Sequence, residues 1–196
     1  MLAMLAFAGA PAATASAQAP SAPANTGGAA YGVIPAKPAA AAQDPVAPAP
    51  PPVPGAEAVL GPDGSAQPPA DAPLEVQDAI AAANQIVGLP YRYGGGHRLP
   101  WKIDRGYDCS GTVSWALHGG GLLKRPLDSS SFLRWGQAGP GQWITVYTRS
   151  SHAFVVIAGL RLDTSAAGDP SGLKGPRWRP TLRSTRGYRA RHPVGF

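Results

Sequence analysis

The feature that most constrains folding in this chain is an abrupt change of composition near residue 72. Up to that point the sequence is mostly Ala, Pro, Gly and Ser, and thirteen of the twenty-three prolines lie between Gln18 and Ala72. Such a composition buries too little apolar surface to fold and favours extended or disordered chain. Trp, Tyr, Leu, Ile and Val become frequent only from Pro73 onward. We therefore predict a disordered Pro/Ala-rich linker over 18–72 and one small folded domain over 73–196.

The first residues have the character of a secretory signal. A short apolar stretch, Met1 to Ala10, is followed by small residues and an A-x-A site at Ala15 to Ala17. This matches the second half of a signal peptide, although the positively charged beginning is missing, so residues 1–17 are predicted to be a truncated signal. More Ala-rich linker is the alternative. The apolar run falls short of the roughly 20 residues that span a bilayer, so we expect a secreted protein without a membrane span.

Periodicity in the second part of the chain predicts helices followed by strands. One helix is expected over 73–88, where Gly88 ends an apolar stripe, and a second runs from Cys109 to His118. The stripe of the first helix is assigned to Leu74, Ala79, Ile80, Ala83 and Val87. Strands are expected at 144–148, 153–158 and 160–163. This order predicts an α+β fold in which N-terminal helices pack on a small antiparallel sheet.

Cys109 is the single cysteine of the chain. In an exported protein an unpaired cysteine indicates either intermolecular pairing or a reactive thiol. The backbone N–H groups and dipole at the start of a helix favour thiolate over thiol, which is the form that attacks carbonyl groups. The alternative is a buried cysteine that only fills space.

A thiolate nucleophile needs a nearby imidazole, and His152 is the best candidate among four histidines. It stands where a loop ends and a buried strand begins. His118 lies on the same helix as Cys109 but roughly 13 Å along its axis, too far for contact. His97 belongs to a Gly-rich loop that can line a cleft, and His192 is expected at the surface of a basic tail.

The imidazole in turn needs an orienting acceptor, for which the sequence offers Asp163. If Ala158 and Gly159 form a two-residue turn, position 152 faces position 165 and Asp163 is the diagonal neighbour of His152 on the same face. A slip of one residue would move Asp163 to the other face and leave Thr164 as the fallback. The alternative is that Asp163 merely caps the local backbone.

Three motifs together resemble the NlpC/P60 family of papain-like cell-wall cysteine peptidases. They are "YRYGG" (Tyr91 to Gly95), "DCSG" (Asp108 to Gly111) and "SHAFVVIAG" followed by a polar residue about a dozen positions later. The resemblance covers roughly residues 74–165. It implies a papain-like fold without cofactor, and an endopeptidase that cuts peptidoglycan stem peptides between D-glutamate and the diamino acid.

The resemblance also assigns roles to individual residues. Cys109 is implied as the nucleophile, His152 as the base and Asp163 as the third polar residue. Tyr91 is implied to place its hydroxyl near the oxyanion, or else it serves as simple packing. Asp108 and Ser110 are implied to hold the amino end of the substrate.

The sequence departs from this family at three points. The third polar residue is Asp where the family often has His, and a carboxylate orients an imidazole at least as well. The segment between Gly96 and Tyr107 is longer than in the compact family form, and "HAFV" replaces the usual "HVGI" at the base. The last two differences bear on substrate specificity.

Charge bears on location and partners more than on activity. Sixteen of the seventeen Lys and Arg residues lie in 73–196, and seven of them follow Gly172 in what reads as a basic C-terminal tail. Such a surface attracts anionic polymers, which for an exported protein means those of the bacterial wall. Nucleic acid is the competing partner, but no nucleic-acid fold motif is present. A lone cysteine and scattered histidines lack the spacing of a metal site.

Two other classes of function remain open from the sequence. One is a catalytically inactive module that binds peptidoglycan through its basic tail. The other is a related thiol enzyme, either an amidase that cuts the sugar–peptide link or an acyltransferase that passes the acyl group to an amine.

Overall fold

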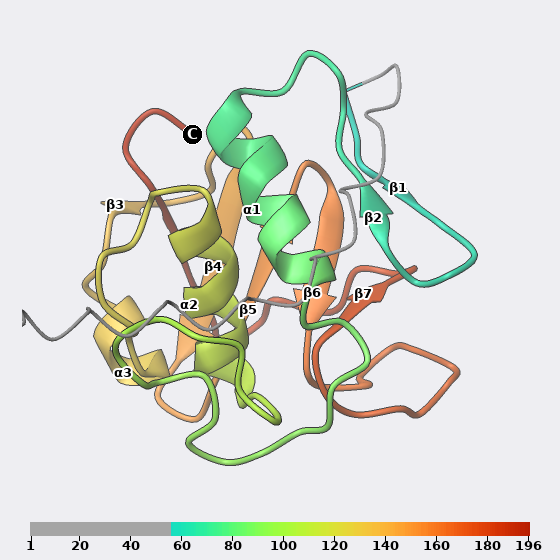
Figure 1. Ribbon diagram of the computed structural model, residues 1–196. Coiled ribbons are helices and arrows are strands. Elements are labelled where there is room, and N and C mark those ends of the chain that lie inside the picture. Colours follow the sequence, from blue (N-terminus) through green and yellow to red (C-terminus); the bar gives the residue numbers. More distant parts are fainter. Residues whose placement is uncertain (1–55) are drawn as a thin grey trace, which may run out of the picture. The chain divides into compact units, whose positions relative to one another are not determined.

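The fold of the globular part centres on one antiparallel sheet with two helices packed against it, seen in a computed structural model that describes residues 56–196 (Figure 1). Six strands lie in the order β3-β8-β4-β5-β6-β7. Their bounds are Gln137–Ala138 (β3), Ile144–Arg149 (β4), His152–Ile157 (β5), Leu160–Asp163 (β6), Arg177–Arg179 (β7) and Arg189–His192 (β8). Helices α1 (Leu74–Asn84) and α2 (Cys109–Gly119) cover one face, and α3 (Ser129–Phe132) is a single turn. The predicted α+β arrangement of helices on an antiparallel sheet is confirmed.

Helix α1 presents an apolar stripe to the core, but the stripe differs from the predicted one at its start. Val76, Ile80 and Ala83 are fully buried, whereas Leu74 is 71% exposed. Successive helical residues are rotated by about 100°, so Leu74 points roughly 200° away from Val76 and faces solvent. The prediction for Leu74 was therefore wrong, and Val76 takes its place.

The two long helices approach each other closely where α2 ends. A Cβ atom on Gly119 would overlap the Cβ of Ala82, and one on Gly120 would overlap the carbonyl oxygen of Glu75. Glycine at these positions therefore serves the contact between the helices as well as the end of α2.

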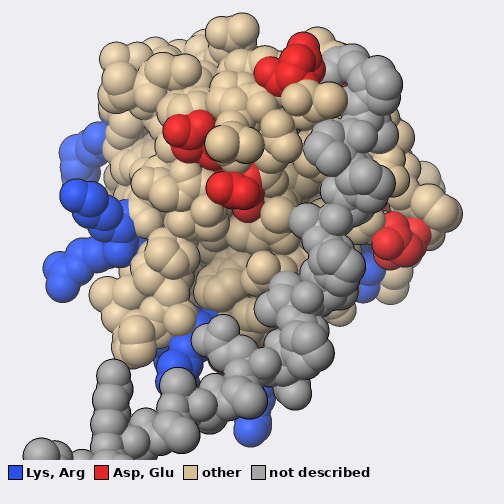
Figure 2. Space-filling view, turned by 45° about the horizontal axis from the view of Figure 1, so that its top comes forward, with Lys and Arg blue, Asp and Glu red and all other residues tan. Residues whose placement is uncertain are grey.

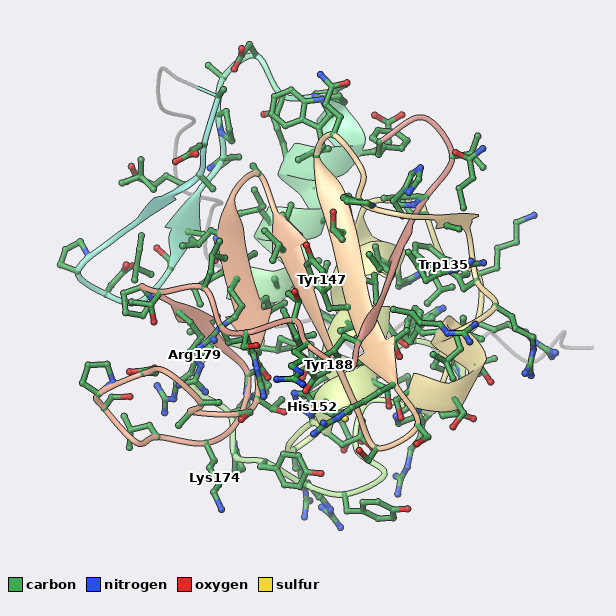
Figure 3. The ribbon with its side chains drawn as sticks, turned by 180° about the vertical axis from the view of Figure 1, so that it is seen from behind. Trp135, Tyr147, His152, Lys174, Arg179 and Tyr188 are labelled. Atoms are coloured by element: carbon green, nitrogen blue, oxygen red, sulfur yellow. The ribbon has the colours of Figure 1, made fainter. Side chains whose placement is uncertain are left out.

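Strand β5 is covered on both faces, as its unbroken apolar sequence predicts. Ala153, Val155 and Ile157 belong to the core that the helices share. On the opposite face, Phe154 stacks on Tyr147 at 5.1 Å between ring centroids and meets Tyr188 edge-on at 5.2 Å. Figure 3 shows Tyr147 and Tyr188 on this face, seen from behind.

Ordered structure begins well before Pro73, inside the segment that the sequence predicts to be linker. A hairpin of β1 (Val59–Leu60) and β2 (Ala66–Gln67) packs on α1, and Ala66 is fully buried. Asn84 bonds both backbone groups of Ala66 and accepts a hydrogen bond from the indole of Trp178. The linker prediction is therefore wrong for this hairpin, because burial of Ala66 in the core and the bonds from Asn84 hold it in place, and composition measures neither. The expected signal peptide and the rest of the expected linker lie outside the described residues.

The basic C-terminal segment is also part of the fold. Strands β7 and β8 extend the sheet at its two sides, next to β6 and β4. Arg179 is fully buried and paired with Asp169. The ring of His192 is hydrogen-bonded to the backbone carbonyl of Gly139 and to the side-chain amide oxygen of Gln137. The expected tail is thus corrected, because its strands and the Arg179–Asp169 ion pair tie the segment into the domain. His192 is partly exposed, which is compatible with its expected surface position.

Charge is nevertheless distributed unevenly over the surface. On the face drawn in Figure 2, most visible acidic side chains lie in the upper part, with further acidic atoms at the right edge, while Lys and Arg side chains project mainly at the left and lower edges. Among the residues described, no helix is both long and apolar enough to cross a membrane.

Candidate active site

Cys109 is the first residue of helix α2, as the sequence predicts, and its side chain is half-buried. The helix is capped by Asp108, whose carboxylate accepts a hydrogen bond from the Gly111 N–H at 2.7 Å. The first N–H groups of a helix lack partners within it, so the Cys109 sulfur lies where the helix favours negative charge.

The "YRYGG" segment fixes the start of this helix from outside. The N–H of Gly94 donates to Asp108 at 2.9 Å, and the Asp108 N–H donates to the carbonyl of Gly95. A Cβ atom on Gly111 would overlap that same carbonyl oxygen. Gly95 of the first motif and Gly111 of the second therefore allow the loop to contact helix α2 next to Cys109.

The register of β5 and β6 brings His152 and Asp163 together. Ile157 pairs with Leu160 across the turn at Ala158 and Gly159, which is the predicted two-residue turn. Asp163 then lies diagonally from His152, and the two side chains are joined at 2.9 Å from Nε2 to Oδ1. The predicted register is confirmed. Thr164, the fallback, is buried and is not the partner of this histidine.

Two polar neighbours, Asp163 first and then Cys109, determine the charge of His152. Burial by itself lowers the pKa of His152, but hydrogen bonds to Asp163 and Cys109 outweigh it and raise the pKa to about 9. Because Nε2 faces Asp163, Nδ1 is the ring nitrogen left for the thiol. Near neutral pH this environment favours an imidazolium beside the sulfur.

Asp163 is held as a buried carboxylate. Burial raises its pKa, but hydrogen bonds from His152, the Ser165 N–H and Arg183 outweigh this and hold the pKa below its usual range. Arg183 donates from Nη1 to Oδ2 at 3.0 Å. Sequence reasoning missed this arginine, because a cation twenty residues beyond Asp163 in an irregular segment carries no periodic signal.

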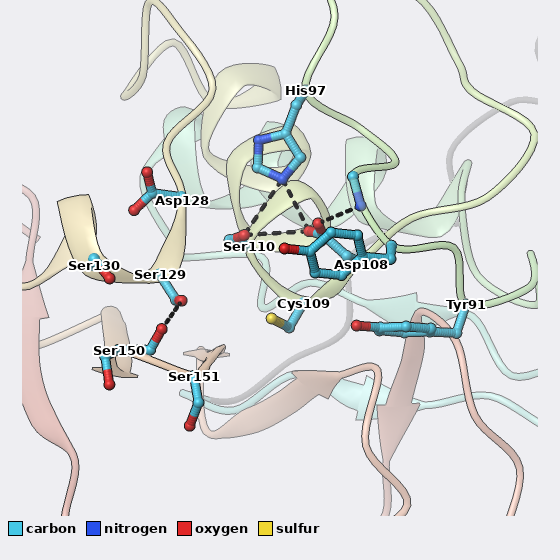
Figure 4. A pocket seen from close by; sticks show the side chains of 12 residues that line it. Tyr91, His97, Asp108, Cys109, Ser110, Asp128, Ser129, Ser130, Ser150 and Ser151 are labelled. Atoms are coloured by element: carbon cyan, nitrogen blue, oxygen red, sulfur yellow. Dashed lines mark hydrogen bonds and ion pairs between the residues drawn. The ribbon is translucent and has the colours of Figure 1, made fainter.

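A cleft of about 620 Å³ opens beside the sulfur (Figure 4). Its lining comes from the Gly-rich loop, the start of α2, the start of α3 and the β4–β5 turn: Tyr91, Tyr93, Gly94, His97, Asp108, Cys109, Ser110, Asp128, Ser129, Ser130, Ser150 and Ser151. A smaller hollow of about 240 Å³ lies on the histidine side, lined by Tyr91, His152, Thr164, Ser165, Ala166 and Lys174. Tyr91 lines both, so the two hollows flank the Cys109–His152 pair.

Tyr91 lines both hollows beside the Cys109–His152 pair, and its role at the oxyanion stays a prediction. Its side chain is 45% exposed and its ring lies near Cys109 in Figure 4. Partial burial, followed by the nearby negative charge of Cys109, raises the pKa of Tyr91, so the phenol keeps its proton. A protonated hydroxyl is a hydrogen-bond donor toward this side of the cleft.

Asp108 and Ser110 lie on the cleft wall but are tied into an internal network. His97 bonds Asp108 at 2.9 Å, and the Ser110 hydroxyl lies 3.2 Å from the same carboxylate oxygen. The bond to Asp108 raises the pKa of His97. Burial raises the pKa of Asp108, but the bonds from His97 and Gly111 outweigh it and lower that pKa. Sequence reasoning placed His97 at a cleft but missed this ion pair.

The serine-rich wall opposite this network was also missed. Asp128 caps α3 by accepting from the Ser131 N–H at 2.7 Å, and the Ser129 hydroxyl donates to the carbonyl of Ser150. Runs of serine look like loops in a sequence, so their place in a cleft has no sequence signal.

His118 takes no part in the site, since its ring stacks on Trp101 at 4.1 Å. Among the described residues no three His, Cys, Asp or Glu side chains gather as metal ligands.

Comparisons with known proteins point to peptidases. The chain is 35% identical over 98 residues to proteins named probable endopeptidases from Mycobacterium tuberculosis and Mycobacterium bovis, a match that covers 46% of this chain and 24% of each relative. It thus spans about a quarter of the length of these relatives. The solved peptidoglycan hydrolase RipB of Mycobacterium tuberculosis is 22% identical, with a TM-score of 0.46 over 70% of this chain and 74% of that one. No family model matches. The names of the curated relatives agree with the peptidase class that the motifs' resemblance to the NlpC/P60 family implies.

Proposed function

We propose that this protein is an exported, papain-like cysteine hydrolase that cleaves amide bonds in peptidoglycan stem peptides. The observation that carries the proposal is the His152–Asp163 pair, hydrogen-bonded at 2.9 Å, which acts together with the neighbouring Cys109 beside an open cleft. The similarity to proteins named probable endopeptidases supports the same reaction class. The bond between D-glutamate and the diamino acid is the target that the family resemblance implies.

The geometry supports a two-step acyl transfer. The Cys109 thiolate attacks the amide carbonyl carbon, and the Tyr91 hydroxyl with a backbone N–H at the start of α2 stabilises the oxyanion. As the C–N bond breaks, the imidazolium of His152 gives its proton to the departing amine. Water, deprotonated by His152, then attacks the thioester and releases the acid and the thiol.

The two hollows give this reaction a direction along the cleft. The leaving amine must lie beside His152, on the side of Tyr91, Ser165 and Lys174. The acyl portion then occupies the larger cleft on the sulfur side, where Asp108 and Ser110 stand. The implied role of these two residues at the amino end of the substrate is consistent with this direction.

Incubation of the full chain and its Cys109→Ala variant with soluble muropeptides, followed by mass spectrometry of the products, tests the proposal. Cleavage by the wild-type chain alone supports a thiol hydrolase and identifies the bond. A product that carries an added amine indicates an acyltransferase, and release of an intact stem peptide from the sugar indicates an amidase. If neither chain cuts and both bind insoluble wall, the protein is a binding module and the proposal is wrong.

A further inference from the structure

Asp163 is bonded on both of its carboxylate oxygens. Oδ1 accepts from His152 at 2.9 Å and from the Ser165 N–H at 2.8 Å, and Oδ2 accepts from Arg183 at 3.0 Å. Its side chain has no exposed surface. These protein bonds therefore set how the buried carboxylate is turned toward the imidazole, and Arg183 is the partner that holds Oδ2.

Arg183 is itself held in a fixed direction. Its side chain is 15% exposed, and its guanidinium lies 5.4 Å from the ring centroid of Phe154 and 5.5 Å from that of Tyr188. Stacking on aromatic faces orients the planar guanidinium and supports its charge. Tyr188 also meets His152 edge-on at 6.3 Å, and Figure 3 shows these two residues side by side.

A second guanidinium near Asp163 makes a different contribution. Arg161 is fully buried with Nε 4.0 Å from Oδ2, and none of its guanidinium nitrogens has a hydrogen-bond partner among residues 56–196. It adds positive charge near the carboxylate without directing it. Arg183 is thus the cation that provides both charge and direction.

We propose that Arg183 is a positioning residue of the proposed hydrolase, which fixes Asp163 so that His152 is aimed at Cys109. This inference rests on the proposed function. Arg183 lines neither the cleft nor the smaller hollow, so it acts on the reaction through Asp163 and not by touching substrate. The C-terminal segment that composition assigns to wall binding then supplies part of the catalytic apparatus.

Loss of this arginine should slow the chemistry and leave substrate binding nearly unchanged. Misplacement of a reacting group by about 1 Å costs on the order of a hundredfold in rate, so we expect kcat to fall about ten- to hundredfold with KM within about twofold of wild type. Arg183→Met keeps a long side chain beside the rings of Phe154 and Tyr188 but removes the charge. Arg183→Lys keeps the charge but lacks the planar guanidinium group.

The experiment measures kcat and KM on soluble muropeptides for the full-length wild type, Arg183→Met, Arg183→Lys and Arg186→Met. Arg186 is exposed on the same segment and provides the matched control. A fall in kcat for both Arg183 variants, with KM and the control unchanged, supports the inference. A further variant, Arg183→Ala, leaves space for an added guanidinium. Partial recovery of its kcat in millimolar methylguanidinium supports the inference further.

The outcomes separate this inference from the proposed function. A wild-type chain that does not cleave overturns both. A wild-type chain that cleaves, with Arg183 variants no slower than the Arg186 control, overturns the positioning role alone. If Arg183→Met fails to fold, as judged by circular dichroism, Arg183→Lys decides: wild-type kcat in the folded variant overturns the inference, and a reduced kcat at unchanged KM supports it.

Discussion

Replacement of Asp163 by Asn should remove most of the pH dependence that His152 gives to stability. Although burial lowers it, the pKa of His152 rises from 6.5 to about 9 in the folded chain, with the hydrogen bond that its ring donates to Asp163 as the largest raising cause. Each pKa unit corresponds to about 1.36 kcal/mol, so protonation of His152 stabilises the fold by about 3 kcal/mol.

The sign of this effect follows from the direction of the shift. A group whose pKa is higher in the folded state stabilises the fold when it is protonated in both states. The contribution of His152 is thus complete below about pH 6.5 and is lost as the pH rises to about 9 and beyond. In Asp163→Asn the imidazolium loses its charged partner, and its pKa should return toward the usual range.

Urea unfolding of the Cys109→Ala background at intervals from pH 5.5 to 9.5 measures this difference. The alanine background removes the thiol, which also raises the pKa of His152, so the expected loss over this range is smaller than the about 3 kcal/mol of the wild-type chain. Asp163→Asn in the same background should lose much less. His97 titrates equally in both chains and cancels. Parallel stability curves for the two chains would refute the reasoning.

Three further predictions concern the surroundings of the site. Asp108→Asn should lower the pKa of His97 toward its usual value, because the hydrogen bond between them is the main cause of the shift, and an NMR titration of the histidine ring measures it. Gly111→Ala should destabilise the fold by about 1–3 kcal/mol in urea unfolding, because its Cβ would overlap the carbonyl of Gly95, and an unchanged midpoint would contradict this. Asn84→Ala should cost about 2–3 kcal/mol through three lost hydrogen bonds, and proteolysis should then cut the β1–β2 hairpin first.

The parts of the site that could be predicted are those fixed by short-range rules. Asp108 ahead of Cys109 is a helix cap, and it does cap α2. Ala158 and Gly159 both have positive φ, 45° and 79°, as a two-residue hairpin turn requires. Once that turn is set, the period of two along the strands places Asp163 beside His152 without further information.

The parts that could not be predicted depend on contacts between distant, polar segments. Strand β7 contains Arg177 and Arg179, and strand β6 contains Arg161, so their sequences look solvent-exposed. In the fold Arg161 and Arg179 are fully buried. A pattern based on hydropathy assigns such residues to the surface, because it does not include the buried carboxylate of Asp163 and the partly exposed carboxylate of Asp169 that lie near them.

This burial changes how binding to the wall must be tested. Deletion of the basic C-terminal segment would be the direct test of whether the protein binds the wall through that segment. The deletion would also remove β8 from its place beside β4, together with Arg183 and its bond to Asp163. Loss of activity or of wall binding in a truncated chain would therefore not tell a binding module apart from an enzyme. Substitution of the exposed Arg186 and Lys174 to Gln leaves the strand and the Asp163 contact intact. We expect the Arg186 change to weaken sedimentation with insoluble wall at low salt without changing kcat, whereas a Lys174 change that raises KM indicates contact with the leaving side of the substrate.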